Sequence, residues 1–176
     1  MDTMGNMDTK RRTCLLIFLL LTLSACGYRF SGGGSLPGGA EVVAVGIFDN
    51  RSGETGVEGI ISNDIIYEFT RSGKNFTYKS EKADAILSGT VVSVTTNSIS
   101  RDTVHSVLER RVTVVISLKL VDSVGAVTWQ ASGLSENEEY EVRADKATTE
   151  MNKREAISRL SRRLAEKVYY QMTDDF

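Results

Sequence analysis

The chain has 176 residues, of which 21 are lysine or arginine and 23 are aspartate or glutamate, so its formal net charge is −2. This balance lacks the positive bias of a nucleic-acid-binding domain, and we expect no nucleic-acid partner. One histidine and two cysteines leave no cluster of soft metal ligands and no Cys–His pair. The sequence therefore predicts a protein that is not an enzyme and uses no metal or cofactor; among enzyme classes, only a hydrolase that uses carboxylates alone stays open.

The N-terminal segment has the three parts of a secretory signal. Basic residues at 10–12 precede an apolar run at 14–23, and two small residues follow it. The run is shorter than the roughly 20 apolar residues that span a bilayer. We therefore assign residues 1–25 to a signal peptide and exclude them from the fold.

The sequence "LSAC", residues 23–26, resembles a bacterial lipobox, in which the cysteine becomes the lipidated first residue after cleavage. Two or more acyl chains on Cys26 would anchor the protein stably at a membrane surface. Gly27, rather than aspartate, in the next position favours the outer membrane over the inner one. Residues 26–40 are then a lipidated N-terminus and a tether, because residues 31–39, "SGGGSLPGG", are rich in glycine.

The remaining residues, 41–176, are enough for a single domain with a core. Its first predicted elements are a strand at 42–48 and an amphipathic helix that begins at Val57 and ends at Ser72-Gly73. A strand candidate follows at 85–95, in which Gly89 is a bulge or a point of close approach. The helix has an apolar stripe and an opposite polar face; the stripe contains Val57, Ile60, Ile61, Ile65 and Phe69, and the polar face contains Glu58, Ser62, Asn63 and Glu68.

The clearest alternation, residues 111–120, predicts a strand with one face on a core. A turn at 122–125 and a returning strand from Val127 complete an antiparallel hairpin, whose second arm runs on toward Val142. The last element is a helix at 149–172. The order predicts an α+β fold with two helices packed on one face of a small mixed four-stranded sheet. The last helix buries Ala156, Ile157, Leu160, Leu164, Ala165, Val168 and Met172 and exposes Lys153, Arg154, Arg159, Arg162, Arg163 and Lys167.

Several charged or polar groups of the sequence are candidates for a site. The glutamates at 136–141 lack the spacing of a calcium loop, so we interpret them as a solvated strand edge, and the basic face of the last helix as a solvated face. His105 is interpreted as a solvated loop residue, and "GETGVEG" lacks the Gly-Lys-Ser/Thr of a phosphate-binding loop. Guanidinium groups bind phosphate through two parallel hydrogen bonds. The basic residues at the ends of the central strands are therefore candidates for a phosphorylated ligand: Arg101, Arg110, Arg111, Arg143 and Lys146.

The whole chain resembles one known family. "LSACGYRF", the tether, the strand "VVAVGIFDN", the hairpin "RRVTVVISLKLVDSVGAVTWQASG" and the terminal helix resemble, in that order, the LptE family of lipopolysaccharide-assembly lipoproteins. The resemblance implies an outer-membrane lipoprotein at the periplasmic face that plugs the β-barrel LptD, helps to assemble it and binds lipopolysaccharide. In the family, that binding is attributed to basic residues near one end of the sheet, for which Arg101 and Lys146 are our first candidates.

A second hypothesis belongs to a different class. Small α/β lipoproteins with flexible tethers also activate peptidoglycan synthases from the outer membrane. The glycine-rich tether of this chain is short, about 30 Å when fully extended, which is poor for crossing the periplasm. The resemblance to the lipopolysaccharide-assembly family is therefore the leading interpretation.

Overall fold

The computed structural model describes residues 36–77, 79–101 and 108–174. The predicted signal peptide, the lipidation site Cys26, most of the glycine-rich tether and His105 lie outside these ranges.

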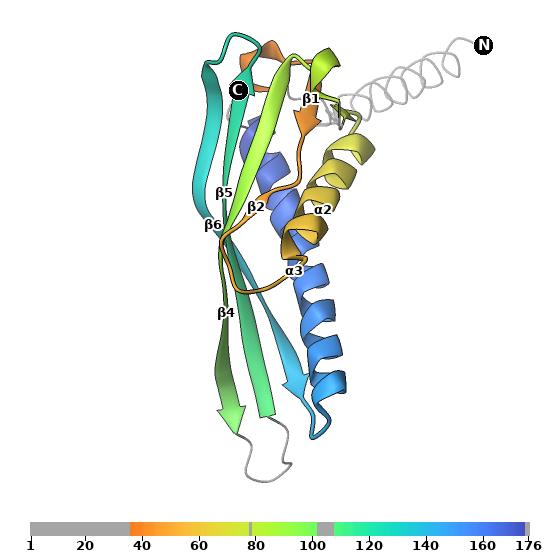
Figure 1. Cartoon of the computed structure of the whole chain (residues 1–176), viewed down its shortest axis with the longest axis vertical. Helices are drawn as coiled ribbons and strands as arrows, with labels where there is room; N and C mark the ends of the chain where they lie inside the picture. The colour runs from red at the N-terminus through yellow and green to blue at the C-terminus, as the bar shows by residue number, and fades with distance from the viewer. Residues whose placement is uncertain (1–35, 78, 102–107, 175–176) are drawn as a thin grey trace, which may run out of the picture. The chain divides into compact units, whose positions relative to one another are not determined.

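One mixed sheet forms the larger layer of the fold (Figure 1). Its strands are β1 (Val42–Val45), β2 (Asp49–Asn50), β3 (Asn75–Thr77), β4 (Ala85–Arg101), β5 (Leu108–Asp122) and β6 (Val127–Val142). The order is β3-β1-β4-β5-β6, and β2 pairs with β4 beside β1. The strand β1 is parallel to β3 and β4, β2 is parallel to β4, and β4, β5 and β6 are antiparallel.

The predicted α+β class is confirmed, but the predicted number of four strands is wrong, because the described residues form six. The two additional strands, β2 and β3, have only two and three residues. Segments this short show no alternation that a sequence pattern could reveal. The predicted extension of β6 to Val142 is confirmed, and β4 continues six residues beyond its predicted end, to Arg101.

The helix α2 (Val57–Arg71) ends where the sequence predicts. Gly73 has a φ of 78°, the left-handed conformation that glycine adopts without a Cβ clash. The N–H of Gly73 donates to the carbonyl of Thr70 at 3.0 Å, and the N–H of Lys74 donates to that of Phe69 at 2.9 Å. These two bonds form a Schellman motif, which satisfies carbonyls that the helix end would otherwise leave open.

The predicted polar face of α2 is partly wrong, because Ser62 and Glu68 are buried. The Ser62 hydroxyl donates to the carbonyl of Glu58 at 2.8 Å, which satisfies it within the helix. Arg71 clamps the Glu68 carboxylate with two hydrogen bonds, of 2.7 and 2.8 Å. Both polar groups can therefore be buried because each has a partner one turn away.

The second helix, α3 (Lys146–Asp174), begins three residues before its predicted start. Its predicted apolar stripe is confirmed, since all seven residues of the stripe are buried. Figure 1 shows α2 and α3 on the same side of the sheet, and α3 continues well beyond the N-terminal end of α2. The core lies between these helices and alternate residues of β4 and β5: Leu87, Val91, Val112, Val114, Ile116, Leu118 and Leu120.

Gly89 is the point of close approach that its position in β4 predicts. Phe48 is 3% exposed, and its ring lies so close to Gly89 that a Cβ atom there would overlap it. The strand thus accommodates the buried ring only because residue 89 has no side chain.

We expect Gly89→Ala to lower the free energy of unfolding by about 1–3 kcal/mol, because the added methyl group displaces the Phe48 ring from a packed core. Urea denaturation measures this change. Gly46→Ala is the matched control, since a Cβ at Gly46 meets no atom within 4 Å. Equal stability of the two variants would contradict the close approach.

Candidate functional site

The structure brings the five predicted basic residues to one end of the sheet, which we call the basic end. Arg101 is the last residue of β4 and pairs with Leu108, the first residue of β5, and Leu108 pairs with Val142, the last residue of β6. The other four therefore lie within a few residues of this end, on the start of β5, just after β6 or at the start of α3: Arg110, Arg111, Arg143 and Lys146.

Two of these cations are already paired with carboxylates of β6. The guanidinium of Arg111 donates to Glu139 at 2.6 Å, and Arg143 pairs with Glu141. Within the part of the chain that the structure describes, Arg110 and Lys146 have no carboxylate partner. The side chain of Arg101 is outside the described part. Arg110 and Lys146 therefore have the most charge available for an anionic ligand.

The start of α3 is fixed next to this basic end by Asp145. Its carboxylate accepts from the backbone N–H of Thr148 at 2.8 Å and from the Thr148 hydroxyl at 2.6 Å. These bonds make Asp145 the N-cap and explain why the helix starts before its apolar stripe. The hydrogen bond from the Thr148 hydroxyl, with those from the N–H groups of Thr148 and Ala147, holds the pKa of Asp145 below its usual value. Lys146 is thus exposed on a first turn that Asp145 caps.

A groove beside the edge strand β6 has the opposite charge. Four carboxylates and one guanidinium line it, with Tyr140 and Asn152 completing the wall. Glu139 and Glu141 are the partners of Arg111 and Arg143, so the groove borders the basic end, and the negative charge that remains in its lining disfavours phosphate within the groove itself. The charged residues are Glu109, Glu139, Glu141, Glu155 and Arg159.

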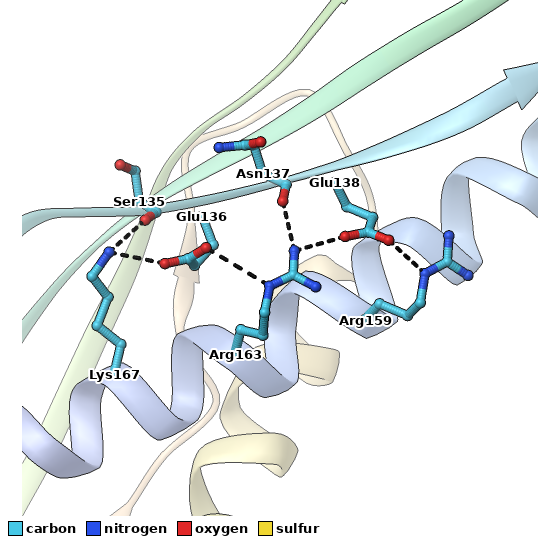
Figure 2. A network of polar contacts seen from close by, with 7 residues as sticks. All are labelled: Ser135, Glu136, Asn137, Glu138, Arg159, Arg163 and Lys167. Atoms are coloured by element: carbon cyan, nitrogen blue, oxygen red, sulfur yellow. Dashed lines mark hydrogen bonds and ion pairs between the residues drawn. The ribbon is translucent and has the colours of Figure 1, made fainter.

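The most extensive polar contact joins β6 to α3 (Figure 2). Lys167 contacts Glu136 at 2.9 Å, Arg163 contacts Glu138 at 2.7 Å, and Arg159 contacts the other oxygen of Glu138 at 2.8 Å. We call these five residues the charge ladder. We predicted a solvated strand edge at 136–141 and a solvated basic face on the last helix. Both predictions are wrong in part, because glutamates of the strand pair with cations of the helix.

The charge ladder also reaches the backbone of β6. Arg163 donates to the carbonyl of Asn137 at 2.6 Å, and Lys167 donates to that of Ser135 at 3.0 Å. Closer to the basic end, the Asn152 amide donates to the carbonyl of Glu141 at 3.0 Å. Side chains of α3 therefore occupy three acceptors on the outer edge of the sheet.

The sequence does contain a signal for the charge ladder. It becomes visible only when the charge spacing of the strand is compared with that of the helix. Glu136 and Glu138 are two residues apart in a strand, which is a rise of about 6.6 Å. Arg159, Arg163 and Lys167 are four residues apart in a helix, which is a rise of about 6 Å per step. Opposite charges at these matching spacings can pair along an antiparallel strand and helix.

The glycine-containing loop at 50–56 is held by contacts of Glu54 and Asn50 with the two helices and within the loop. Glu54 pairs with Lys153 of α3, and the Asn50 amide donates to Glu58 at 2.6 Å and to the Glu54 carbonyl at 2.7 Å. This loop joins the start of α2 to α3, and its one lysine contact is neutralised by Glu54.

Within residues 36–77, 79–101 and 108–174, no three His, Cys, Asp or Glu side chains are grouped closely enough to hold a metal ion. Neither described helix has an apolar stretch of the length that crossing a membrane requires.

The fold is that of a small α+β domain, and solved structures of bacterial lipoproteins are similar to it to different degrees. Lipoprotein B from Nitrosomonas europaea has 15% sequence identity and a TM-score of 0.51, with 79% of this chain and 84% of that chain covered. A minor lipoprotein from Acinetobacter baumannii has 13% identity and a TM-score of 0.49, with coverage of 77% and 92%. No curated protein matches the sequence significantly.

A family model described as "LptE: Lipopolysaccharide-assembly" matches residues 40–172. The match covers most of the chain and nearly all of the described domain. The chain therefore belongs to the LptE family of lipopolysaccharide-assembly proteins, and the family resemblance predicted from the sequence is confirmed.

The charge ladder makes stability depend on pH. The hydrogen bond from Arg159, with support from Arg163, lowers the pKa of Glu138, although partial burial acts in the opposite direction. A carboxyl group with a lower pKa in the folded state stabilises the fold above its unfolded-state pKa, and this stabilisation is lost as the pH falls through the folded-state pKa.

We therefore expect Glu138→Gln to lower the free energy of unfolding by about 1 kcal/mol at neutral pH, a value reduced for the partial exposure of the pairs. The difference from wild type should shrink in acid, where Glu138 is itself protonated. Urea denaturation across this pH range measures it. Glu139→Gln is the matched control, because its pair with Arg111 is about half exposed and its loss should cost less. A pH-independent effect of Glu138→Gln would contradict this role.

Proposed function

We propose that the protein is an outer-membrane lipoprotein, lipidated on Cys26 at the periplasmic face, that plugs and helps to assemble the LptD β-barrel and binds lipopolysaccharide during its insertion at the cell surface. The observation that carries this proposal is the LptE family match over residues 40–172. The lipobox-like "LSAC" sequence and the similarity to bacterial lipoproteins support the anchor.

The surface of the domain is suited to a plug. The lumen of a large transmembrane β-barrel is polar, so a plug needs hydrophilic faces around a core of its own. The face of the sheet away from the helices is mainly polar in its middle, and the outer part of β4 is polar and exposed. The first set includes Ser88, Thr90, Ser117, Lys119 and Gln130, and the second includes Thr95, Thr96, Asn97 and Ser98.

The basic end supports the proposed lipid binding. Phosphorylated glycolipids offer phosphate groups, which Arg and Lys bind through charge-assisted hydrogen bonds. Arg110 and Lys146 are the cations there without a described carboxylate partner, and Arg101 is at the end of the neighbouring strand. We therefore propose Arg101, Arg110 and Lys146 as the main contacts, with Arg111 and Arg143 as contacts that must first exchange their glutamate partners.

Co-purification tests the plug. We expect a tagged full-length chain, extracted in mild detergent, to recover one large outer-membrane barrel protein, identified by mass spectrometry. A Cys26→Ala variant should leave the membrane fraction when the barrel is absent and still fold. Recovery of the tagged chain alone, or with a peptidoglycan synthase, would contradict the proposal.

Charge reversal tests the basic end. We expect Arg101→Asp with Lys146→Asp to weaken lipopolysaccharide binding by at least about tenfold, because two phosphate contacts are replaced by repulsion. Lys82→Asp with Lys119→Asp makes the same change in net charge at the other end of the sheet and should leave binding unchanged. A displacement assay with purified lipopolysaccharide measures both, and equal loss in the two variants would show a nonspecific effect of net charge.

A further inference from the structure

The end of the sheet opposite the basic end has a row of apolar side chains on the face away from the helices. Ile86, Val121 and Val127 are direct neighbours in β4, β5 and β6. A one-residue bulge at Thr128 places Val127 on the same face as Val121. Ile86 is 46% exposed, Val127 is 52% exposed and Val124, in the turn beyond the row, is 87% exposed. We call Ile86, Val121, Val124 and Val127 the apolar tip.

The apolar tip is bordered by a row of polar side chains, and its turn contains internal hydrogen bonds. The next row on the same face consists of Ser88, Lys119 and Gln130. Within the turn, the Asp122 carboxylate accepts from the N–H groups of Val124 at 3.0 Å and Ala126 at 2.8 Å. The turn therefore holds Val124 outward while the N–H groups of Val124, Gly125 and Ala126 have acceptors within the turn, which lowers the cost of placing it next to an apolar environment.

The described chain begins at this same end. Leu36 and Pro37 are buried, and Gly38 lies against Thr128, the bulge residue next to Val127. Cys26 is ten residues before Leu36, so the sulfur that would carry the lipid is within about 35 Å of it. Figure 1 shows this start of the chain beside the β5–β6 turn and far from the basic end.

We propose that the apolar tip rests in the boundary between headgroups and acyl chains of the membrane that holds Cys26. The inference rests on the proposed lipidation. The tip is too small to bind a membrane alone, but the acyl anchor keeps it at high effective concentration near the lipid, where a weak contact is sufficient. Anchor and tip together hold this end of the sheet at the bilayer surface, and the basic end is the opposite end of the sheet.

Site-specific fluorescence tests the contact. The full-length lipidated chain carries Val124→Cys with an environment-sensitive dye and is reconstituted in phosphatidylethanolamine and phosphatidylglycerol vesicles with brominated acyl chains. Ser98→Cys, an exposed position near the basic end, carries the same dye as the control. We expect severalfold stronger quenching at 124 than at 98, and equal quenching would overturn the proposal.

Two further variants separate the tip from the anchor. Val127→Asp, added to the labelled Val124→Cys chain, should remove most of the quenching, whereas Ile99→Asp, the same change at a residue that is 40% exposed far from the tip, should not. Retained quenching with Val127→Asp would overturn the role of the apolar row. The unsubstituted chain should take no dye, because its mature form has no free thiol if Cys26 is lipidated; labelling there would overturn the anchor itself.

Discussion

The antiparallel strands are longer than the layer that covers them, and this mismatch determines how the molecule is built. β5 has 15 residues and extends about 50 Å, whereas α2 has 15 residues and extends only about 22 Å. Only α3, with 29 residues and about 44 Å, follows the sheet as far as the basic end. One part of the sheet therefore has two helices over an apolar core, and the other part is closed by α3 alone.

The charge ladder follows from this arrangement. β6 is the edge strand, and Glu136 and Glu138 on its side toward α3 are only partly buried, whereas Leu134 and Tyr140 on the same side are buried. Glu136 and Glu138 are opposite Val114 and Val112 of β5. The side chains that face α3 are therefore apolar on the inner strand β5 and charged at these two positions of the edge strand β6. Each exposed pair contributes little by itself. The matched spacings of strand and helix, however, favour one alignment of α3 along β6, because a shift by one residue would break every pair.

Local patterns in the sequence predicted most of the fold and part of the site. The stripe of α3, the end of α2 at Gly73 and the extent of β6 depend on residues close in sequence, and all are confirmed. Patterns show which side of an element is polar but not what faces it, which is why the charge ladder and the buried Glu68 were missed. Two bulges in β6, one at Gly133 and one at Thr128, move Glu139 rather than Asn137 opposite Arg111. Counting residues outward from the β5–β6 turn gives the wrong partner for Arg111, because the sequence does not reveal the bulges. The sequence therefore could not show that Arg111 and Arg143 are paired with glutamates while Arg110 and Lys146 are not.

The bonds from α3 to the carbonyls of Ser135, Asn137 and Glu141 have a consequence for how the sheet can grow. An edge strand normally offers open acceptors to any extended chain, but here three of them are occupied within the same molecule. A foreign strand could join residues 135–141 of β6 only by first detaching the helix. At the other edge, β4 beyond Val91 pairs only with β5 among the described residues, and no charged side chain occurs between Asp84 and Arg101. Strand addition, whether in assembly or in aggregation, is therefore less obstructed along the outer part of β4 than along residues 135–141 of β6.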